Sequence, residues 1–166
     1  MPVPPQRPDP VRPADDDARA LARQLLADAT FCALAVVEPG TGHPFASRIA
    51  LGRDASGLPL SLVSGLALHT RALRAAPACC LLVGEPGPKG DPLTHPRLSL
   101  RAVAEFVDPA SPDHDDLRRS WLARNPKATV YASLPDFSFV RFRPTSAALN
   151  GGFARAFSLT DQDLSG

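Results

Sequence analysis

The stretch "LVSGLALHTRALRAAPACCLLV", residues 62–83, begins and ends as an apolar run, while its middle holds a serine, a histidine, a threonine and two arginines. The apolar start predicts a strand. Residues 65–76, between this strand and Pro77, are predicted to form a helix of about three turns, because a proline cannot continue a helix. Ser64 stands where an N-cap residue would stand. The stretch therefore predicts a strand, a helix and another strand, with polar side chains gathered near the start of the helix.

Further apolar runs of strand length, bounded by turn residues, lie on both sides of this stretch. A short amphipathic helix is expected from Asp15, where apolar residues recur at helical spacing, and a second one over residues 113–124. Six strands are expected, at residues 31–38, 45–51, 58–64, 78–85, 97–107 and 137–144. Because most connections have hairpin length, we expect a mainly β fold with flanking helices, built as a six-stranded antiparallel barrel.

The chain has 166 residues, which is the size of one domain. Residues 1–14 are rich in proline and charge and are expected to form a disordered arm, followed by a single domain over 15–166. The formal net charge is +1, and there is one Trp and one Tyr, so nucleic acid is not expected as a partner. No uncharged stretch of about 18 apolar residues occurs, so we expect no membrane span and a cytoplasmic protein.

The three cysteines, Cys32, Cys79 and Cys80, lie in apolar runs and have no C-x-x-C spacing. Their odd number and their surroundings favour small buried hydrophobic side chains in a reducing compartment. Neither a disulfide nor a metal site is expected from them.

The polar residues of the opening stretch permit two interpretations. A helix start exposes unpaired N–H groups and the positive end of the helix dipole, so hydroxyl and cationic side chains there favour a phosphate-binding site. Alternatively, Ser64 only caps the helix, Thr70 faces the core together with Leu66 and Leu73, and the arginines lie in solvent.

Several motifs of the chain resemble the FMN-binding split-barrel superfamily of pyridoxamine 5'-phosphate oxidase, and among its branches the haem-utilisation (HugZ-like) proteins. The resemblance runs from about Arg19 to Leu159. It rests on "FASRIAL", "LVSGLALHTRALRAAP", "LLVGEP", "GDPLTHPRLSL" and "NGGFARAF".

The resemblance implies a homodimeric split barrel with a flavin at the dimer interface. We expect "NGGFARAF" close to that interface, because its paired glycines permit close approach of two backbones. It implies that the second strand contacts the flavin and that the helix after the third strand holds its phosphate. The cofactor-binding residues implied in this way are Ser47, Arg48, Ile49, Ala50, Ser64, His69, Thr70 and Arg71. FMN is the expected cofactor, with haem or the deazaflavin F420 as alternatives.

The chain also departs from the family patterns. It has no late Arg-x-His motif of the kind that binds substrate in pyridoxamine phosphate oxidases, and no histidine follows His114. The haem-degrading relatives imply an axial histidine in a C-terminal extension. Any haem is therefore expected to bind weakly or through one of the histidines present, which are His43, His69, His95 and His114.

Three functions remain open from the sequence. The first is a flavin-dependent oxidoreductase that acts on an unidentified small molecule, with no catalytic residue assigned. The second is a haem-binding or haem-degrading protein, and the third is a dimeric binding module without a cofactor. A hydrolase is not expected, because "LVSGLA" lacks the G-x-S-x-G pattern and Asp54, His69 and Ser64 would have to meet by chance.

Overall fold

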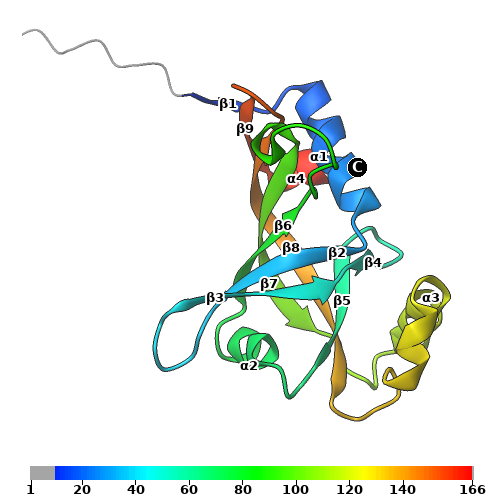
Figure 1. The fold of residues 1–166 in the computed structure, drawn as a ribbon. Helices are drawn as coiled ribbons and strands as arrows, with labels where there is room; N and C mark the ends of the chain where they lie inside the picture. Colours follow the sequence, from blue (N-terminus) through cyan, green and yellow to red (C-terminus); the bar gives the residue numbers. More distant parts are fainter. Residues whose placement is uncertain (1–9, 166) are drawn as a thin grey trace, which may run out of the picture.

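The computed structural model describes residues 10–165 (Figure 1). Its helices are α1 (Asp16–Asp28), α2 (Leu68–Ala75), α3 (His114–Arg124) and α4 (Asp161–Leu164), with two 3-10 turns at Pro92–Thr94 and Pro126–Val130. Its strands are β1 (Val11–Pro13), β2 (Phe31–Val37), β3 (Pro44–Ala50), β4 (Gly52–Arg53), β5 (Pro59–Ser64), β6 (Ala78–Val83), β7 (Arg97–Phe106), β8 (Phe137–Asn150) and β9 (Ala156–Thr160).

The strands form one curled sheet in the order β1-β9-β8-β7-β6-β2-β3, and β5 pairs with both β8 and β4. Every pairing is antiparallel except that of β1 with β9. The sheet curls so that β3 lies near β5, yet these two strands are not paired in it. The fully buried Ser61 hydroxyl on β5 donates to the Ala50 carbonyl of β3 at 2.7 Å. A side-chain hydrogen bond therefore links the two strands at this opening in the barrel.

The six expected strands are confirmed as β2, β3, β5, β6, β7 and β8, whereas β1, β4 and β9 were not expected. The last expected strand ended at Pro144, but β8 continues to Asn150. Proline has no N–H to donate, which normally confines it to edges and irregular positions. Pro144 lies opposite Ala102, where the register with β7 shifts between Arg101 and Ala102, so the strand tolerates it.

Helix α1 agrees with the sequence pattern. The Asp15 side chain caps it by accepting a 2.8 Å hydrogen bond from the Ala18 N–H, and Ala18, Ala22 and Leu26 form its buried face. Ordered structure begins before the expected start at Asp15, because residues 11–13 pair with β9. The rest of the expected arm, residues 1–9, lies outside the described residues.

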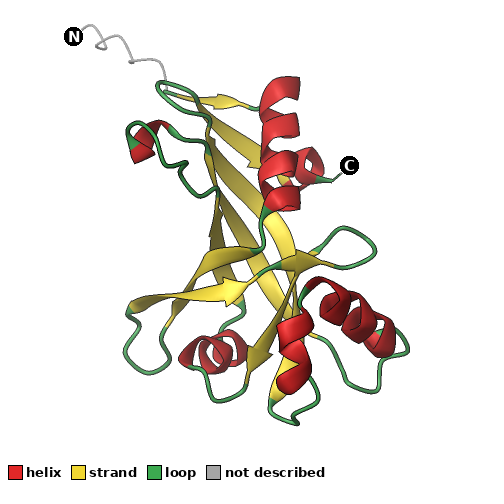
Figure 2. Cartoon of the chain, turned by 45° about the vertical axis from the view of Figure 1, so that its right-hand side comes forward, coloured by secondary structure: helices red, strands yellow, loops and turns green. Residues whose placement is uncertain are grey.

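The core has two parts. The larger one lies between the curled sheet, α1 and α2. The smaller one lies beneath α3, where Trp121 meets the Phe139 ring edge-on at a centroid distance of 6.0 Å. Helices α1 and α4 lie at one end of the sheet and α2 and α3 at the other (Figures 1 and 2). Within residues 10–165, no helix is long and apolar enough to cross a membrane.

The cysteines lie on β2 and β6. Cys32 is buried, Cys79 and Cys80 are half-buried, and all three thiols are free. Burial raises the pKa of Cys32 and of Cys79 to about 12, so both thiols are protonated at neutral pH. They serve as packing side chains rather than as nucleophiles.

Candidate functional site

Helix α2 begins later than the sequence predicts. Its N-cap is Ala67, which has no side-chain capping bond, so the N-cap role expected for Ser64 is wrong. The Ser64 hydroxyl donates to an Asp136 carboxylate oxygen at 2.9 Å, and the Gly65 N–H donates to the Asp136 carbonyl at 2.6 Å. These bonds hold residues 64 and 65 against the segment before β8, so the chain turns there before the helix can start.

Two of the expected site residues meet directly. Nδ1 of His69, in the first turn of α2, lies 3.0 Å from the Ser47 hydroxyl oxygen on β3. Both side chains are half-buried. Burial lowers the pKa of His69 below its ordinary value of 6.5, so the ring is neutral at pH 7. Its other nitrogen, Nε2, has no hydrogen-bond partner among the residues that the structure describes.

The next two residues of the helix point in different directions. Thr70 is fully buried beside Ala72 and Leu73, and its hydroxyl has no hydrogen-bond partner within residues 10–165. Arg71 is exposed. The buried position agrees with the alternative in which Thr70 faces the core, although Leu66, expected beside it, is 82% exposed.

The remaining expected residues lie along β3. The Arg48 guanidinium lies over the Phe31 ring, 5.3 Å from its centroid, on the outer face of the sheet. Ile49 is buried in the core, and the Ala50 carbonyl accepts the Ser61 bond. Of the eight expected residues, Ser47 and His69 are thus joined by a side-chain bond, and Arg71 is exposed on the same helix.

The outer face of β2, β6 and β7 carries exposed apolar side chains. Side chains alternate along β2, so that Phe31, Ala33, Ala35 and Val37 face outward. Leu82 lies opposite Ala33, and Val103 lies on the neighbouring strand β7. The exposed fractions are 37% for Phe31, 50% for Val37, 43% for Leu82 and 37% for Val103.

The other three histidines have separate surroundings. Nδ1 of His95 accepts from the Gly87 N–H at 3.1 Å, and Nε2 lies 2.9 Å from the Lys89 carbonyl oxygen, so both ring nitrogens are engaged within one loop. His114 stacks edge-on against Phe139, with centroids 5.6 Å apart. His43 is exposed in the turn between β2 and β3.

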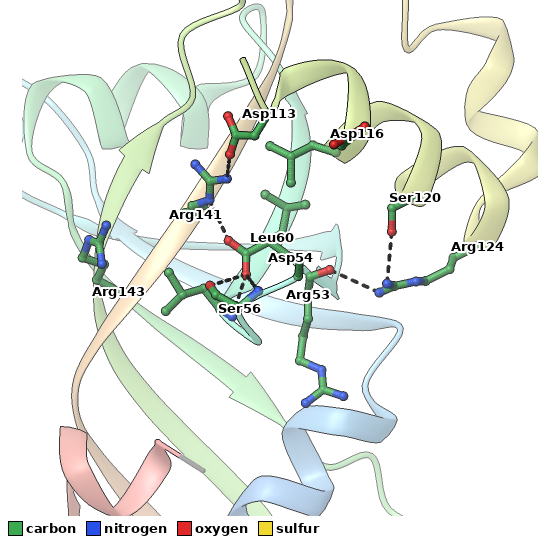
Figure 3. A pocket seen from close by; sticks show the side chains of 13 residues that line it. Arg53, Asp54, Ser56, Leu60, Asp113, Asp116, Ser120, Arg124, Arg141 and Arg143 are labelled. Carbon is green, nitrogen blue, oxygen red and sulfur yellow. Dashed lines mark hydrogen bonds and ion pairs between the residues drawn. The ribbon is translucent and has the colours of Figure 1, made fainter. Parts of the chain in front are cut away.

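A cavity of about 570 Å³ lies between the β4–β5 turn and α3 (Figure 3). Its wall is an ion-pair network in which Nε of Arg141 donates to Asp54 at 2.7 Å and the same guanidinium also bonds Asp113. The Asp54 side chain is 6% exposed, and it also accepts bonds from the Ser56 hydroxyl and from the Ser56 and Leu58 N–H groups.

Sequence reasoning missed this cavity, because residues 53–57 were interpreted as a turn and Asp113 as the start of a helix. The motif "RDASG" offered one signal, since an aspartate that begins a turn can also accept an ion pair. The residues of the rejected hydrolase triad are bonded to other partners: Asp54 to Arg141, His69 to Ser47 and Ser64 to Asp136. No group of three His, Cys, Asp or Glu side chains within residues 10–165 is arranged to hold a metal ion.

No protein-family model matches the chain. A curated relative, the chloroplast non-canonical heme oxygenase HOZ of Arabidopsis thaliana, is 34% identical over 116 residues, which are 70% of this chain. The chain spans about a third of that relative's length, since the match covers 34% of it.

Several solved structures are similar to this chain in fold. One solved chain is 48% identical, with a TM-score of 0.82 over 92% of this chain and 98% of its own. A heme binding protein from Mycobacterium smegmatis is 29% identical, with a TM-score of 0.80 over 93% of this chain and 61% of its own. A putative pyridoxamine 5'-phosphate oxidase from Listeria innocua shares the fold, with 17% identity and a TM-score of 0.62 over 79% of this chain and 96% of its own. The chain therefore has the split-barrel fold that pyridoxamine 5'-phosphate oxidase-like proteins share, and the proteins to which it is similar include a heme binding protein and a heme oxygenase.

Proposed function

We propose that this split-barrel protein binds haem and that Nε2 of His69 would hold its iron. The observation that carries the proposal is the contact between His69 and Ser47. An iron ligand must be a neutral imidazole with a lone pair on one nitrogen, and the other nitrogen is usually held by a hydrogen bond. When Nδ1–H donates to the Ser47 hydroxyl, the lone pair is on Nε2. The similarity to a haem oxygenase and to a heme binding protein supports the same choice.

The helix that carries His69 also offers a cation for the carboxylates of haem. Haem combines an apolar macrocycle with two carboxylates, so its site needs apolar surface and at least one cation. Arg71 is exposed on the same helix, and no carboxylate among the described residues pairs with it. The bound group would supply a redox-active iron, while His69 would supply a nitrogen ligand and Arg71 the charge that orients the carboxylates. The Arabidopsis relative is a heme oxygenase, whereas for this chain we propose haem binding alone.

The proposal includes a homodimer. The apolar outer face of β2, β6 and β7, described above, is the kind of surface that protein partners cover. In the segment "NGGFARAF", Phe153 is 90% exposed, which supports the expectation that this segment also lies near the interface. A two-fold dimer would place the same patch on both subunits.

FMN is the second candidate, and the superfamily fold favours it. The expected phosphate site, however, offers fewer donors than the sequence suggests. Thr70 has no exposed atom, and Ser64 donates to a carboxylate whose charge would repel a phosphate. His69 and Arg71 remain as possible phosphate ligands. A neutral histidine with one engaged nitrogen suits an iron atom better than a dianion.

Titration of the purified apo-protein with haemin, FMN, riboflavin and F420 tests the choice. We expect saturable haemin binding with a shifted Soret band, and weaker binding of the three flavin-type ligands. Preferential FMN binding, with riboflavin much weaker, would replace the haem proposal by the flavin one. Saturable binding of none of the four would favour a binding module without a cofactor.

A further inference from the structure

The cavity beside α3 is separate from the proposed haem site. It shares no residue with the eight positions expected to bind a cofactor, and its volume of about 570 Å³ lies within the range of small-molecule sites. Its wall is preorganised, because the Asp54–Arg141–Asp113 network ties the β4–β5 turn to β8 and to the start of α3.

The positive charges at the mouth of this cavity are not all compensated. Arg53 and Arg124 are exposed, and neither is paired with a carboxylate in the described part of the chain. Arg124 donates to two neutral acceptors, the Arg53 carbonyl at 3.2 Å and the Ser120 hydroxyl at 3.1 Å. In Figure 3, Arg124 reaches from α3 toward the backbone of Arg53, whose own side chain points toward α1.

The acidic side chains of the cavity already have cationic partners. Asp54 and Asp113 share Arg141, and Asp116 pairs with Arg119 outside the cavity. Arg143, which also lines the cavity, pairs with Glu105. Asp54, Asp113 and Arg141 together carry one net negative charge, and the unpaired Arg53 and Arg124 carry two positive charges. The mouth of the cavity is therefore positive.

A second cavity, of about 840 Å³, continues this surface toward α1. The two cavities share Arg53, Ser56, Leu58 and Arg143. The second one adds Arg23, whose side chain donates at 3.4 Å to the carbonyl of Asp163, and one acidic residue, Asp161. Arg53 and Arg143 are therefore the basic residues that line both cavities.

We propose that the cavity beside α3 binds a small organic anion. Its carboxylate or phosphate group pairs with Arg124, and also with Arg53 once the exposed Arg53 side chain turns from α1 toward Arg124. Its apolar part lies against the leucine side chains of the lining, which are Leu58, Leu60 and Leu117. Arginine suits this role because its planar guanidinium can donate two parallel hydrogen bonds to either group. The proposal does not depend on haem binding at His69.

The probes are hexyl phosphate, hexanoate, hexanol and inorganic phosphate, which separate the contributions of the charged and apolar parts. Trp121 is the one tryptophan of the chain and shares the core beneath α3 with Leu60 and Leu117, so its fluorescence reports on this cavity. We expect hexyl phosphate or hexanoate to bind, measured by calorimetry and by Trp121 fluorescence, and hexanol and inorganic phosphate to bind at least tenfold more weakly. The better of the two anions identifies the head group.

The variants are Arg53→Gln and Arg124→Gln, with Lys127→Gln as the control that removes one exposed positive charge elsewhere. Each arginine variant should weaken the better anion by about tenfold, because each removes a charge-assisted hydrogen bond. The control should change the affinity by less than about twofold. The proposal is wrong if neither anion binds the wild type, if hexanol binds equally well, or if the control weakens binding as much as the arginine variants do.

Discussion

Nδ1 of His69 and the hydroxyl oxygen of Ser47 lie 3.0 Å apart and join the first turn of α2 to β3. This contact holds the imidazole in one orientation, with Nε2 left without a partner among the described residues. The burial that lowers the pKa of His69 also keeps the ring neutral at physiological pH. The contact therefore leaves Nε2 of a neutral histidine available as a ligand at the start of α2.

The neutral state of His69 predicts a pH dependence of stability. The unfolded chain takes up a proton at this residue near pH 6.5, whereas the folded chain resists the same protonation. Stability should therefore fall as the pH drops through about 6.5. Urea unfolding at about pH 7.5 and about pH 5.5 measures the fall. This loss of stability should be smaller in His69→Gln than in the wild type. In His43→Gln, the control at an exposed histidine, the loss should equal that of the wild type. An equal fall in wild type and His69→Gln would contradict this prediction.

Because Asp54 pairs with Arg141, we expect Asp54→Ala to lower the free energy of unfolding substantially. The substitution removes three local hydrogen bonds and one carboxylate from Arg141, whose side chain is 20% exposed. The free energy of unfolding should drop by about 2–4 kcal/mol, since Asp113 remains as a partner. Asp116→Ala, at an exposed pair, should cost less than about 1 kcal/mol. Similar costs for the two variants would show that the buried network contributes no more than a surface pair.

The same pair should weaken in acid. Burial alone would raise the pKa of Asp54, but hydrogen bonds from Ser56, Arg141 and the backbone outweigh it and lower that pKa below its ordinary value of 3.8. The stability that the ionised carboxylate contributes is present above about pH 4 and is lost as the pH falls through the folded-state pKa. The difference between wild type and Asp54→Ala should therefore shrink in acid.

The backbone at position 84 requires a glycine. Its φ is +99°, and a Cβ atom there would lie 2.5 Å from the Pro96 carbonyl oxygen. Gly84→Ala should therefore destabilise the fold by more than about 2 kcal/mol. Gly40, with a φ of +84° and open space within 4 Å of where a Cβ atom would lie, is the matched control, and Gly40→Ala should cost about 1 kcal/mol. Thermal unfolding compares the two, and equal costs would exclude the close contact as the cause.

The apolar outer face predicts the position of a dimer interface. Leu82→Asp would place a charge in its centre, so the variant should be monomeric in light scattering at concentrations where the wild type is dimeric. Leu66→Asp, at a side chain 82% exposed in the turn before α2, should remain dimeric. A monomeric wild type at micromolar concentration would contradict the dimer itself, and a dimeric Leu82→Asp would place the interface elsewhere.

The sequence predicts the strands and α1 well, because their apolar patterns are local. The start of α2 is less predictable, since Asp136, which holds Ser64 and Gly65, comes about 70 residues later in the chain. The extension of β8 beyond Pro144 depends on a register shift in its pairing with β7, which no local pattern reveals.

The cavity beside α3 and the site around His69 show the same limit. Asp54 and Arg141 are 87 positions apart and meet only because β5 pairs with β8. The sequence leaves Thr70 open between a phosphate site at the start of the helix and the core, and in the structure its side chain is fully buried. His69 and Ser47 were both expected near a cofactor, yet their bond depends on how α2 lies against β3.

The most direct test of the haem proposal is the absorption spectrum of the haemin-loaded protein in wild type, His69→Ala and Ser47→Ala. We expect the wild-type Soret band to move in His69→Ala and to be restored by added imidazole, while Ser47→Ala weakens haemin affinity by about 10- to 100-fold with the ligand retained. Haemin binding with an identical spectrum in wild type and His69→Ala would show that haem binds but that His69 is not its ligand. Absence of saturable haemin binding to the wild type would contradict the proposed function itself.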